Sequence, residues 1–338
     1  MRLQSNGSPT FISDVAVNAS GSAVVAGVCL GDGILTLGNY TVDTRGIGNC
    51  LFVARLNRNG TWVLAVQTIG PGGTTIARHL VLDADGNAVV AGETTASTAA
   101  FGSYTVASPI TTAGKREFVS FVARLNAAGT WTQVAQTTNS CYTNALALDG
   151  SGDVWLTGQF NSPTVSFGAF DLTNSDLNSV QNNHFDLYLA RLNSAGTWTF
   201  ATTATNAVSR TLVLSTGQAV VAGSFTSPAT FGTTTITCAA QQAGFLANLS
   251  GGVLATKVTT TVPPVCVAWP NPATSYTTLS LTADAAPRPV QLLDALGHEV
   301  RRLELPAHTT SLTLSTVGLP SGYYLLRCGA STGRLAVD

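Results

Sequence analysis

The sequence predicts an all-β protein, with a β-propeller of about four blades of ~65 residues followed by a C-terminal immunoglobulin-like β-sandwich. Three observations predict this fold class. Short strand-like segments recur every 65 or 66 residues, no segment keeps the 3.6-residue apolar period of a helix, and the composition changes at a Thr/Pro stretch. We expect propeller repeats over 1–258, a stiff linker over 259–265 and a second domain over 266–338.

Composition and charge exclude several classes of partner. Of the 338 residues, 45% are hydrophobic, enough for a core, but only 10% are charged and the formal net charge is −1. The only lysines are Lys115 and Lys257, whereas nucleic acids and anionic membranes are bound by a basic face. No apolar run approaches the ~20 residues that span a bilayer. We therefore expect no nucleic-acid partner and no membrane span.

The repeat has three recognisable elements. The first is an apolar segment that ends in glycine, at Gly27, Gly92, Gly158 and Gly223. The second is a Leu-Gly or Phe-Gly pair, at Leu37-Gly38, Phe101-Gly102, Phe167-Gly168 and Phe231-Gly232. The third is an Ala-Arg-Leu-Asn turn that starts at Ala54, Ala123 and Ala190, with a weaker copy at Ala247. Four short strands joined by Asn- and Gly-containing turns fit this spacing, as in a propeller blade.

The closure of the predicted ring has two alternatives. Residues 2–7 resemble the Arg-Leu-Asn turn but lack the strand that should follow it, while residues 252–258 form a surplus strand. That strand would fill the gap in the first blade and close a ring of four blades. In the second alternative, Met1 is not the natural start and further blades lie upstream.

The cysteines and acidic turns give no metal site. The six cysteines form no CxxC pair, so zinc is not expected, and they are compatible with a few disulfides or with buried thiols. If a disulfide forms, Cys29 and Cys50 are the expected pair. The turn at 83–87 has acids like those of a calcium loop, but the twelve-residue pattern with its terminal Glu is absent, and the corresponding positions 18–22 and 215–218 carry no acids. We expect a plain turn, no metal and no cofactor.

Segments 86–92 and 152–158 resemble the core motif of the bacterial β-propeller repeat family. This resemblance covers residues 10–260. It implies an extracellular scaffold and no defined chemistry.

The last domain carries four motifs in order: a Trp-Pro-Asn-Pro segment, an Asp-Ala-Leu-Gly turn, a Leu-Pro-Ser-Gly-Tyr-Tyr strand and a terminal Gly-Arg-Leu. Together they resemble the type A C-terminal sorting domain of the type IX secretion system. The residues that carry the resemblance are Pro270, Asn271, Pro272, Asp294, Gly297, Gly322, Tyr324 and Arg334. Arg334 stands where this family usually has lysine.

The resemblance implies a route of export. Such proteins enter the periplasm by a signal peptide and are recognised there by the type IX machinery. They cross the outer membrane and are then released or anchored at the surface. Residues 1–9 contain no signal peptide, so we expect a truncated N-terminus and a secreted or outer-surface protein.

Candidate chemistry is sparse. His79, His184, His298 and His308 follow no catalytic or metal-binding spacing, and no Gly-x-Ser-x-Gly elbow is present. No catalytic constellation is recognised, so we do not expect an enzyme.

Arg55, Arg124 and Arg191 recur at matched positions. A ring of arginines could bind a carboxylate, but we expect each one to support its own blade. There are likewise two alternatives for Trp62, Trp131 and Trp198: the side chains pack between strands, which we favour, or they form a platform on which a sugar stacks.

Residues that break the repeat are better candidates for ligand binding. The longest irregular insertion, 173–184, is rich in Asn and Ser and suits recognition of a polar ligand. Its candidate residues are Asp176, Asn178, Asn182 and His184. The predicted function is binding or adhesion to an unknown extracellular glycan or protein. The alternatives are a carbohydrate-active propeller enzyme, such as a glycosidase or lyase, and a passive surface scaffold.

Overall fold

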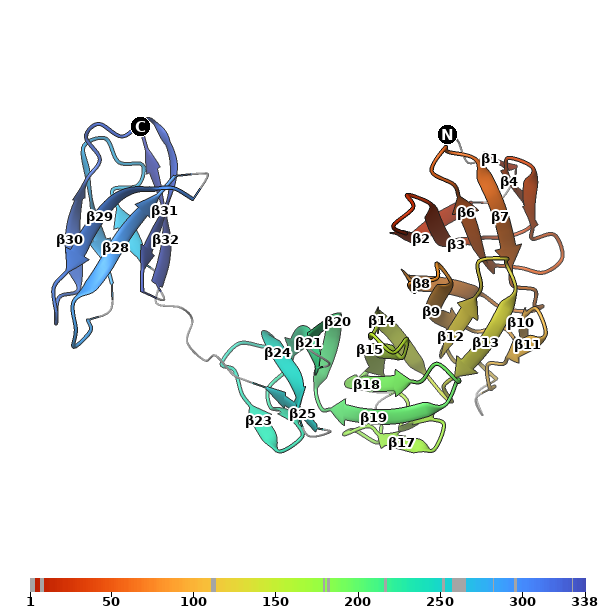
Figure 1. The fold of residues 1–338 in the computed structure, drawn as a ribbon. Coiled ribbons are helices and arrows are strands. Elements are labelled where there is room, and N and C mark those ends of the chain that lie inside the picture. Colours follow the sequence, from red (N-terminus) through yellow and green to blue (C-terminus); the bar gives the residue numbers. More distant parts are fainter. Residues whose placement is uncertain are drawn as a thin grey trace. The chain divides into compact units, whose positions relative to one another are not determined.

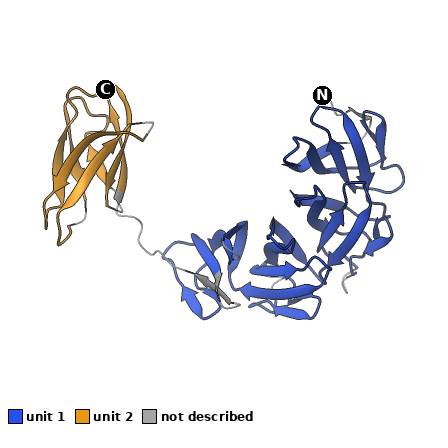
Figure 2. Cartoon of the chain, viewed as in Figure 1, with its two compact units in different colours: residues 1–258 blue, residues 259–338 orange. Residues whose placement is uncertain are grey.

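The protein is all-β and divides into two compact units. The computed structural model describes residues 4–6, 9–110, 114–178, 180, 183–215, 218–250, 253–256, 266–281, 283–294, 297–329 and 331–338. Unit 1 spans 1–258 and unit 2 spans 259–338 (Figure 2). The predicted linker, 259–265, lies outside the described residues. In the part of the chain that is described, the named elements are strands, β1 to β32.

Unit 1 contains four antiparallel sheets with the same strand order (Figure 1). Sheet I consists of β2 (Thr10–Val17), β3 (Ala23–Cys29), β6 (Cys50–Leu56) and β7 (Trp62–Gln67). Sheet II consists of β8 (Thr75–Leu82), β9 (Ala88–Thr94), β12 (Val119–Leu125) and β13 (Trp131–Gln136). Sheet III contains β14 (Cys141–Leu148), β15 (Val154–Phe160), β18 (Asp186–Leu192) and β19 (Trp198–Ala204) in this order, and β22 (Ala229–Phe231) and β23 (Thr234–Ile236) extend it through the pairing of Ala204 with Phe231. Sheet IV consists of β20 (Ala207–Ser215), β21 (Gln218–Phe225), β24 (Ala243–Ser250) and β25 (Val253–Thr256).

Neighbouring sheets share their cores. The apolar cluster of sheets I and II includes Leu51 and Leu80, and that of sheets III and IV includes Leu187 and Phe245. The first strand of each sheet contacts the first strand of the next, so β2, β8, β14 and β20 lie in succession (Figure 1). We call these four strands the inner strands.

A hairpin follows the second strand of every sheet. The four hairpins are β4 (Ile34–Leu37) with β5 (Tyr40–Asp43), β10 (Ala99–Phe101) with β11 (Tyr104–Val106), β16 (Thr164–Phe167) with β17 (Phe170–Thr173), and β22 (Ala229–Phe231) with β23 (Thr234–Ile236). The Leu-Gly and Phe-Gly pairs form their turns. Gly102, for example, has φ +60°, which a glycine adopts without the steric cost of a Cβ.

The recurring tryptophans pack on these hairpins. The rings of Phe101 and Trp131 meet edge to face at 5.0 Å, and those of Phe167 and Trp198 do the same at 5.0 Å. Trp131 and Trp198 are only 6% and 8% exposed, so neither offers a face on which a sugar could stack. Their role is packing, and the partner is the hairpin of their own sheet.

The recurring arginines are engaged by turns. Arg55 of sheet I donates to the Gly86 carbonyl of sheet II at 2.7 Å, and Arg124 of sheet II donates to Gly152 O of sheet III at 2.6 Å. Arg191 instead pairs with two acids of its own sheet, at 2.8 Å and 3.0 Å. These side chains therefore support turns, and two of the three support the neighbouring sheet rather than their own.

Two expectations about the ends of unit 1 are wrong. The strand expected to be surplus, within 252–258, supplies β25, which pairs with β24 as the fourth strand of sheet IV. It is used in its own sheet and is not available to the first. The second expectation concerns residues 2–7, of which 4–6 are described. These form β1 (Gln4–Asn6), which pairs with β4 rather than making an Arg-Leu-Asn turn.

All six cysteines are free thiols. Cys29 and Cys50 are nevertheless directly opposed across β3 and β6, and both are buried. The structure therefore agrees with the alternative of buried thiols at this pair, and no disulfide joins them.

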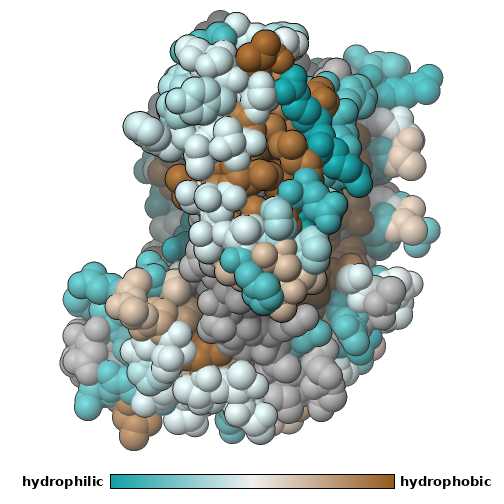
Figure 3. Space-filling view, turned by 90° about the vertical axis from the view of Figure 1, so that its left-hand side faces the viewer, coloured by the Kyte–Doolittle hydropathy of each residue, from teal (hydrophilic) through white to brown (hydrophobic). Residues whose placement is uncertain are grey.

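Unit 2 consists of two sheets around one core. The first contains β26 (Val267–Trp269), β27 (Tyr276–Ser280) and β30 (Ser311–Ser315). The second contains β29 (Glu299–Leu305), β28 (Arg288–Leu293), β31 (Gly322–Cys328) and β32 (Ser331–Val337). Leu279 and Leu314 of the first sheet share a buried cluster with Leu292 and Leu326 of the second. Apolar side chains gather on the side of this unit seen in Figure 3.

Candidate functional site

The inner strands share a local irregularity. Each has a β-bulge, at Ser13, Arg78, Asn144 and Arg210, where the pairing with the second strand shifts by one residue. A bulge bends the strand and redirects the extra side chain. The four bulges lie at matched positions and carry serine, arginine, asparagine and arginine, so the same geometry presents a different side chain in neighbouring sheets.

The glycine of the recurring apolar segment lies opposite each bulge. A Cβ at Gly92 would overlap the carbonyl oxygen of Ile76, and the same clash occurs at Gly158 with Tyr142 O. Only glycine accommodates this close approach of two backbones. The regular spacing of these glycines along the chain therefore indicates where each bulge lies.

A pocket of about 260 Å³ lies beside the bulges of sheets II and III. We call it the inner-strand pocket. It is lined by Arg78, His79, Glu93, Tyr142, Thr143, Asn144, Gln159 and Arg210. Three of the four bulge residues contribute to it, and they come from sheets II, III and IV.

Glu93 is the fixed centre of this pocket. The residue is only 1% exposed, and one carboxylate oxygen accepts a 2.7 Å bond from Arg78 Nε. The other accepts a 2.7 Å bond from the Thr143 amide of sheet III. Burial raises the pKa of Glu93, and the Arg78 charge and the Thr143 amide act against that rise. Glu93 thus holds sheets II and III together and orients Arg78.

The remaining polar groups face the pocket from neighbouring strands. The Asn144 amide donates to Ser209 O at 2.8 Å and lies 3.5 Å from the Gln159 amide oxygen. Burial lowers the pKa of His79, which keeps this imidazole neutral at pH 7. Arg210 is exposed and has no ion pair with any residue that the structure describes. The pocket therefore combines two guanidinium groups, two amides and one engaged carboxylate.

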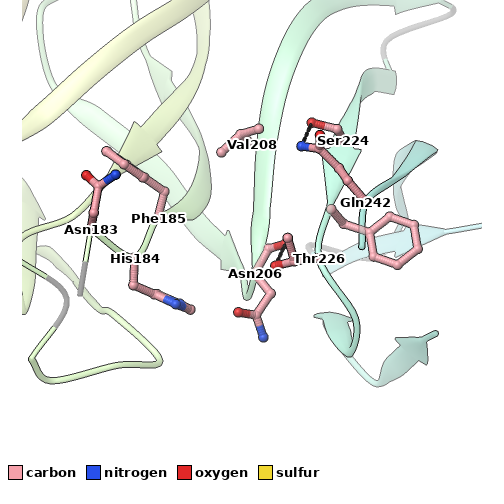
Figure 4. Close-up of a pocket in the computed structure, with 9 residues that line it drawn as sticks. Asn183, His184, Phe185, Asn206, Val208, Ser224, Thr226 and Gln242 are labelled. Atoms are coloured by element: carbon pink, nitrogen blue, oxygen red, sulfur yellow. Dashed lines mark hydrogen bonds between the residues drawn. The ribbon is translucent and has the colours of Figure 1, made fainter. Parts of the chain in front are cut away.

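The predicted loop residues are only partly brought together. His184 lines a second pocket of about 220 Å³, opposite Ser224, Thr226 and Gln242 (Figure 4). Asp176 and Asn178 do not line it; the Asn178 amide bonds to the Asp176 carboxylate at 2.8 Å within the loop. Asn182 lies outside the described residues.

The surroundings of His184 resemble a catalytic triad in composition but not in arrangement. Its Nε2 atom lies 2.9 Å from Ser175 Oγ and 3.1 Å from Asp186 Oδ1. In a Ser-His-Asp relay, the serine and the acid contact different ring nitrogens. Here both contact Nε2, and Ser175 Oγ also bonds to Asp186 at 3.0 Å. The cluster fixes the loop and contains no activated nucleophile.

Within the described residues, no group of three or more His, Cys, Asp or Glu side chains could hold a metal ion. The acidic turn at 83–87 is closed by its own backbone, since Asp83 Oδ1 accepts the amides of Asp85 at 3.0 Å and Asn87 at 2.8 Å. No helix found in the described segments is long and apolar enough to cross a membrane.

The sorting-motif residues of unit 2 hold its strand ends. The Asn271 side chain donates to Arg334 O at 2.9 Å and accepts from the Ala336 amide at 2.8 Å, which fixes β32 beside the Trp-Pro-Asn-Pro segment. Tyr324 donates to Pro320 O at 2.6 Å. Asp294 accepts from the His298 amide at 2.9 Å in a turn where Gly297 has φ +85°.

Three further motif residues lie at strand ends of this unit. Pro270 O accepts from Thr277 Oγ1 at 2.9 Å, and Pro272 precedes Ala273, which pairs with Val337. Gly322 begins β31. The family described as "Secretion system C-terminal sorting domain" matches residues 267–336.

Residues 267–336 are a secretion sorting domain. This match indicates export through the type IX secretion system to the cell surface or the outer environment, and it implies interaction with that machinery. No curated protein matches the chain.

Two solved structures are similar over most of the chain. One is a protein of unknown function from Bacteroides caccae, 9% identical, with TM-score 0.36, covering 97% of this chain and 87% of the other. The second is the extracellular domain of a hybrid two-component system from B. thetaiotaomicron, 12% identical, with TM-score 0.29, covering 97% of this chain and 50% of the other.

The bulge residues were missed in the sequence. Ser13, Arg78 and Asn144 each lie 14 residues before the glycine of their copy, and Arg210 lies 13 before Gly223. A position that varies at a nearly fixed offset from an invariant glycine is the signal that would have identified them.

Proposed function

We propose that the protein is a non-enzymatic binding protein that the type IX secretion system delivers to the cell surface or beyond. In this proposal sheets I to IV are blades of a β-propeller, and the sorting domain is an immunoglobulin-like sandwich. The common strand order of the four sheets and the contacts between successive inner strands support the propeller.

The inner-strand pocket carries the proposal of binding. Arg78, Asn144 and Arg210 reach it from three different sheets through one repeated backbone device. The bulge position is not uniform from copy to copy, since sheets I and III carry Ser13 and Asn144 there, whereas sheets II and IV carry arginine. Different polar groups that converge on one cavity are what recognition of an extracellular glycan or protein requires.

A carbohydrate-active enzyme is the second candidate, but the pocket argues against it. Glycoside hydrolysis ordinarily needs two carboxylates that face one bond. Among the residues that line the inner-strand pocket, Glu93 is the one carboxylate, and both of its oxygens are engaged. A passive scaffold is the third candidate, and it predicts no ligand.

The test is a screen of the full chain against panels of extracellular glycans and matrix proteins. We expect saturable binding that falls at least several-fold in Gln159→Ala, because its amide lines the pocket, and that is unchanged in the exposed-turn control Asn59→Ala. Empty screens on both panels would favour the passive scaffold. Turnover of a bound glycan that is lost in Glu93→Gln, with binding retained, would establish the enzyme instead.

A further inference from the structure

We propose that the inner-strand pocket recognises the carboxylate of an acidic sugar unit, with Arg210 and Arg78 as the groups that bind it. This inference rests on the proposed binding function and names its ligand class. It concerns different arginines from the three that recur in the sequence, since those are engaged by turns.

The charge balance of the pocket carries the first step. Arg78 and Arg210 supply two positive charges, and the buried Glu93 supplies one negative charge, so the lining has an excess of one cation. Glu93 bonds to Arg78 through Nε alone, and the Arg78 side chain stays 48% exposed. Among the described residues, the two terminal nitrogens of Arg78 have no hydrogen-bond or ion-pair partner.

The geometry of a guanidinium group carries the second step. Its paired N–H groups match the two oxygens of a carboxylate, and such bidentate bonds are stronger and more directional than a contact with lysine. Glu93 fixes Arg78 by its Nε, which orients the terminal nitrogens before a ligand arrives. Arg210 has no competing acid among the described residues, so its charge is available to the same ligand.

The neutral groups favour a sugar over an acidic peptide. Asn144 and Gln159 place two amides in the lining, and amides both donate to and accept from hydroxyl groups. Tyr142 supplies an aromatic wall that packs on Phe118 at 5.5 Å and on Phe185 at 6.0 Å. A rigid aromatic ring, hydroxyl-binding amides and guanidinium groups together fit one uronate unit of a polysaccharide.

The experiment measures the affinity of the full chain for an oligogalacturonate and for its methyl-esterified, neutral counterpart by calorimetry. We expect the acidic form to bind at least tenfold more tightly, since charge-assisted bonds are lost in the ester. Arg210→Gln should remove this preference. The exposed Arg58→Gln should preserve it, because Arg58 lies in a turn of sheet I and does not line the pocket.

The outcomes separate this inference from the proposed function. Equal binding of both forms, or an acid preference that Arg210→Gln leaves intact, would overturn the carboxylate site while binding stands. Equally tight binding of a sulfated oligosaccharide would overturn the selection of carboxylate, and binding of acidic peptides alone would overturn the sugar. If the protein bound neither a glycan nor a matrix protein, the proposed function itself would be refuted.

Discussion

Replacement of Gly92 by alanine should destabilise the protein much more than the same replacement of a glycine in an open position. The new Cβ would overlap Ile76 O and lie 3.0 Å from Ile76 C and 3.1 Å from Ala77 Cα. All three atoms belong to backbone at the bulge of β8, so no side-chain rotation can relieve the clash. Overpacking usually costs about 1–3 kcal/mol, and a clash with backbone should lie at the upper end, about 3 kcal/mol.

The chain supplies a matched control for this change. A Cβ at Gly150 would meet nothing within 4 Å, and its φ lies outside the positive region. Gly150→Ala should therefore change the free energy of unfolding by less than about 1 kcal/mol, and can raise it by restricting the unfolded chain.

The assay is urea unfolding of the full chain, followed by tryptophan fluorescence, for the parent and both variants. We expect a clear fall in the midpoint for Gly92→Ala, with little change for Gly150→Ala. If the two variants unfold at the same urea concentration, the account of the bulge and its glycine is wrong.

Three more predictions test other parts of the structure. Phe167→Ala removes a ring with no exposed surface from between Tyr188 and Trp198, and should lower the free energy of unfolding by about 3–5 kcal/mol, measured in the same assay; a loss below 1 kcal/mol would contradict the packing described. Desolvation raises the pKa of Asp149, but hydrogen bonds from Ser151, Trp155 and the Asp153 amide outweigh this effect, so that the pKa falls to about 2. Its contribution is therefore present above pH 3.8 and is lost as the pH falls towards 2, so Asp149→Asn should be less stable than the parent at pH 7 and should approach it at pH 2; a constant difference would refute this assignment. Asn271→Ala removes two bonds to the last strand and should destabilise the sorting domain by about 1–3 kcal/mol and reduce export, seen as less protein in the culture medium and on cells; unchanged export would separate these bonds from sorting.

Local patterns in the sequence predicted much that the structure shows about individual segments. The Phe-Gly pairs occupy hairpin turns because a positive φ favours glycine, and the Asn and Asp turns close on their own amides. The absence of a helical period agrees with the all-β architecture. The order of motifs from Trp269 onward predicted the sorting domain, and in the structure the Asn271 side chain donates to the Arg334 carbonyl of the last strand while Tyr324 donates to the Pro320 carbonyl.

Long-range partners could not be predicted in the same way. The arginines were assigned to their own copy, but Arg55 reaches a carbonyl 31 residues further along the chain, in the next sheet. The strand within 252–258 was taken as surplus, and one of two alternatives placed it in the first copy, whereas it pairs with its neighbour in sequence, β24. Sequence spacing alone does not specify which edge a strand pairs with.

The inner-strand pocket escaped prediction for a related reason. Arg78, Asn144 and Arg210 are far apart in sequence and are not all of one type, so they form no motif. A bulge brings each of them to the same side of successive sheets. The insertion chosen instead, 173–184, contributes His184 to a separate pocket.

Export through the sorting domain, on which the proposed function depends, can be measured directly. The chromosomal gene would be replaced, in the bacterium that encodes it, by a form without residues 267–338. Cell fractions and medium would then be compared by immunoblot against residues of unit 1. We expect the complete protein on the cell surface or in the medium and the shortened form retained in the periplasm. The same distribution for both forms would contradict the account.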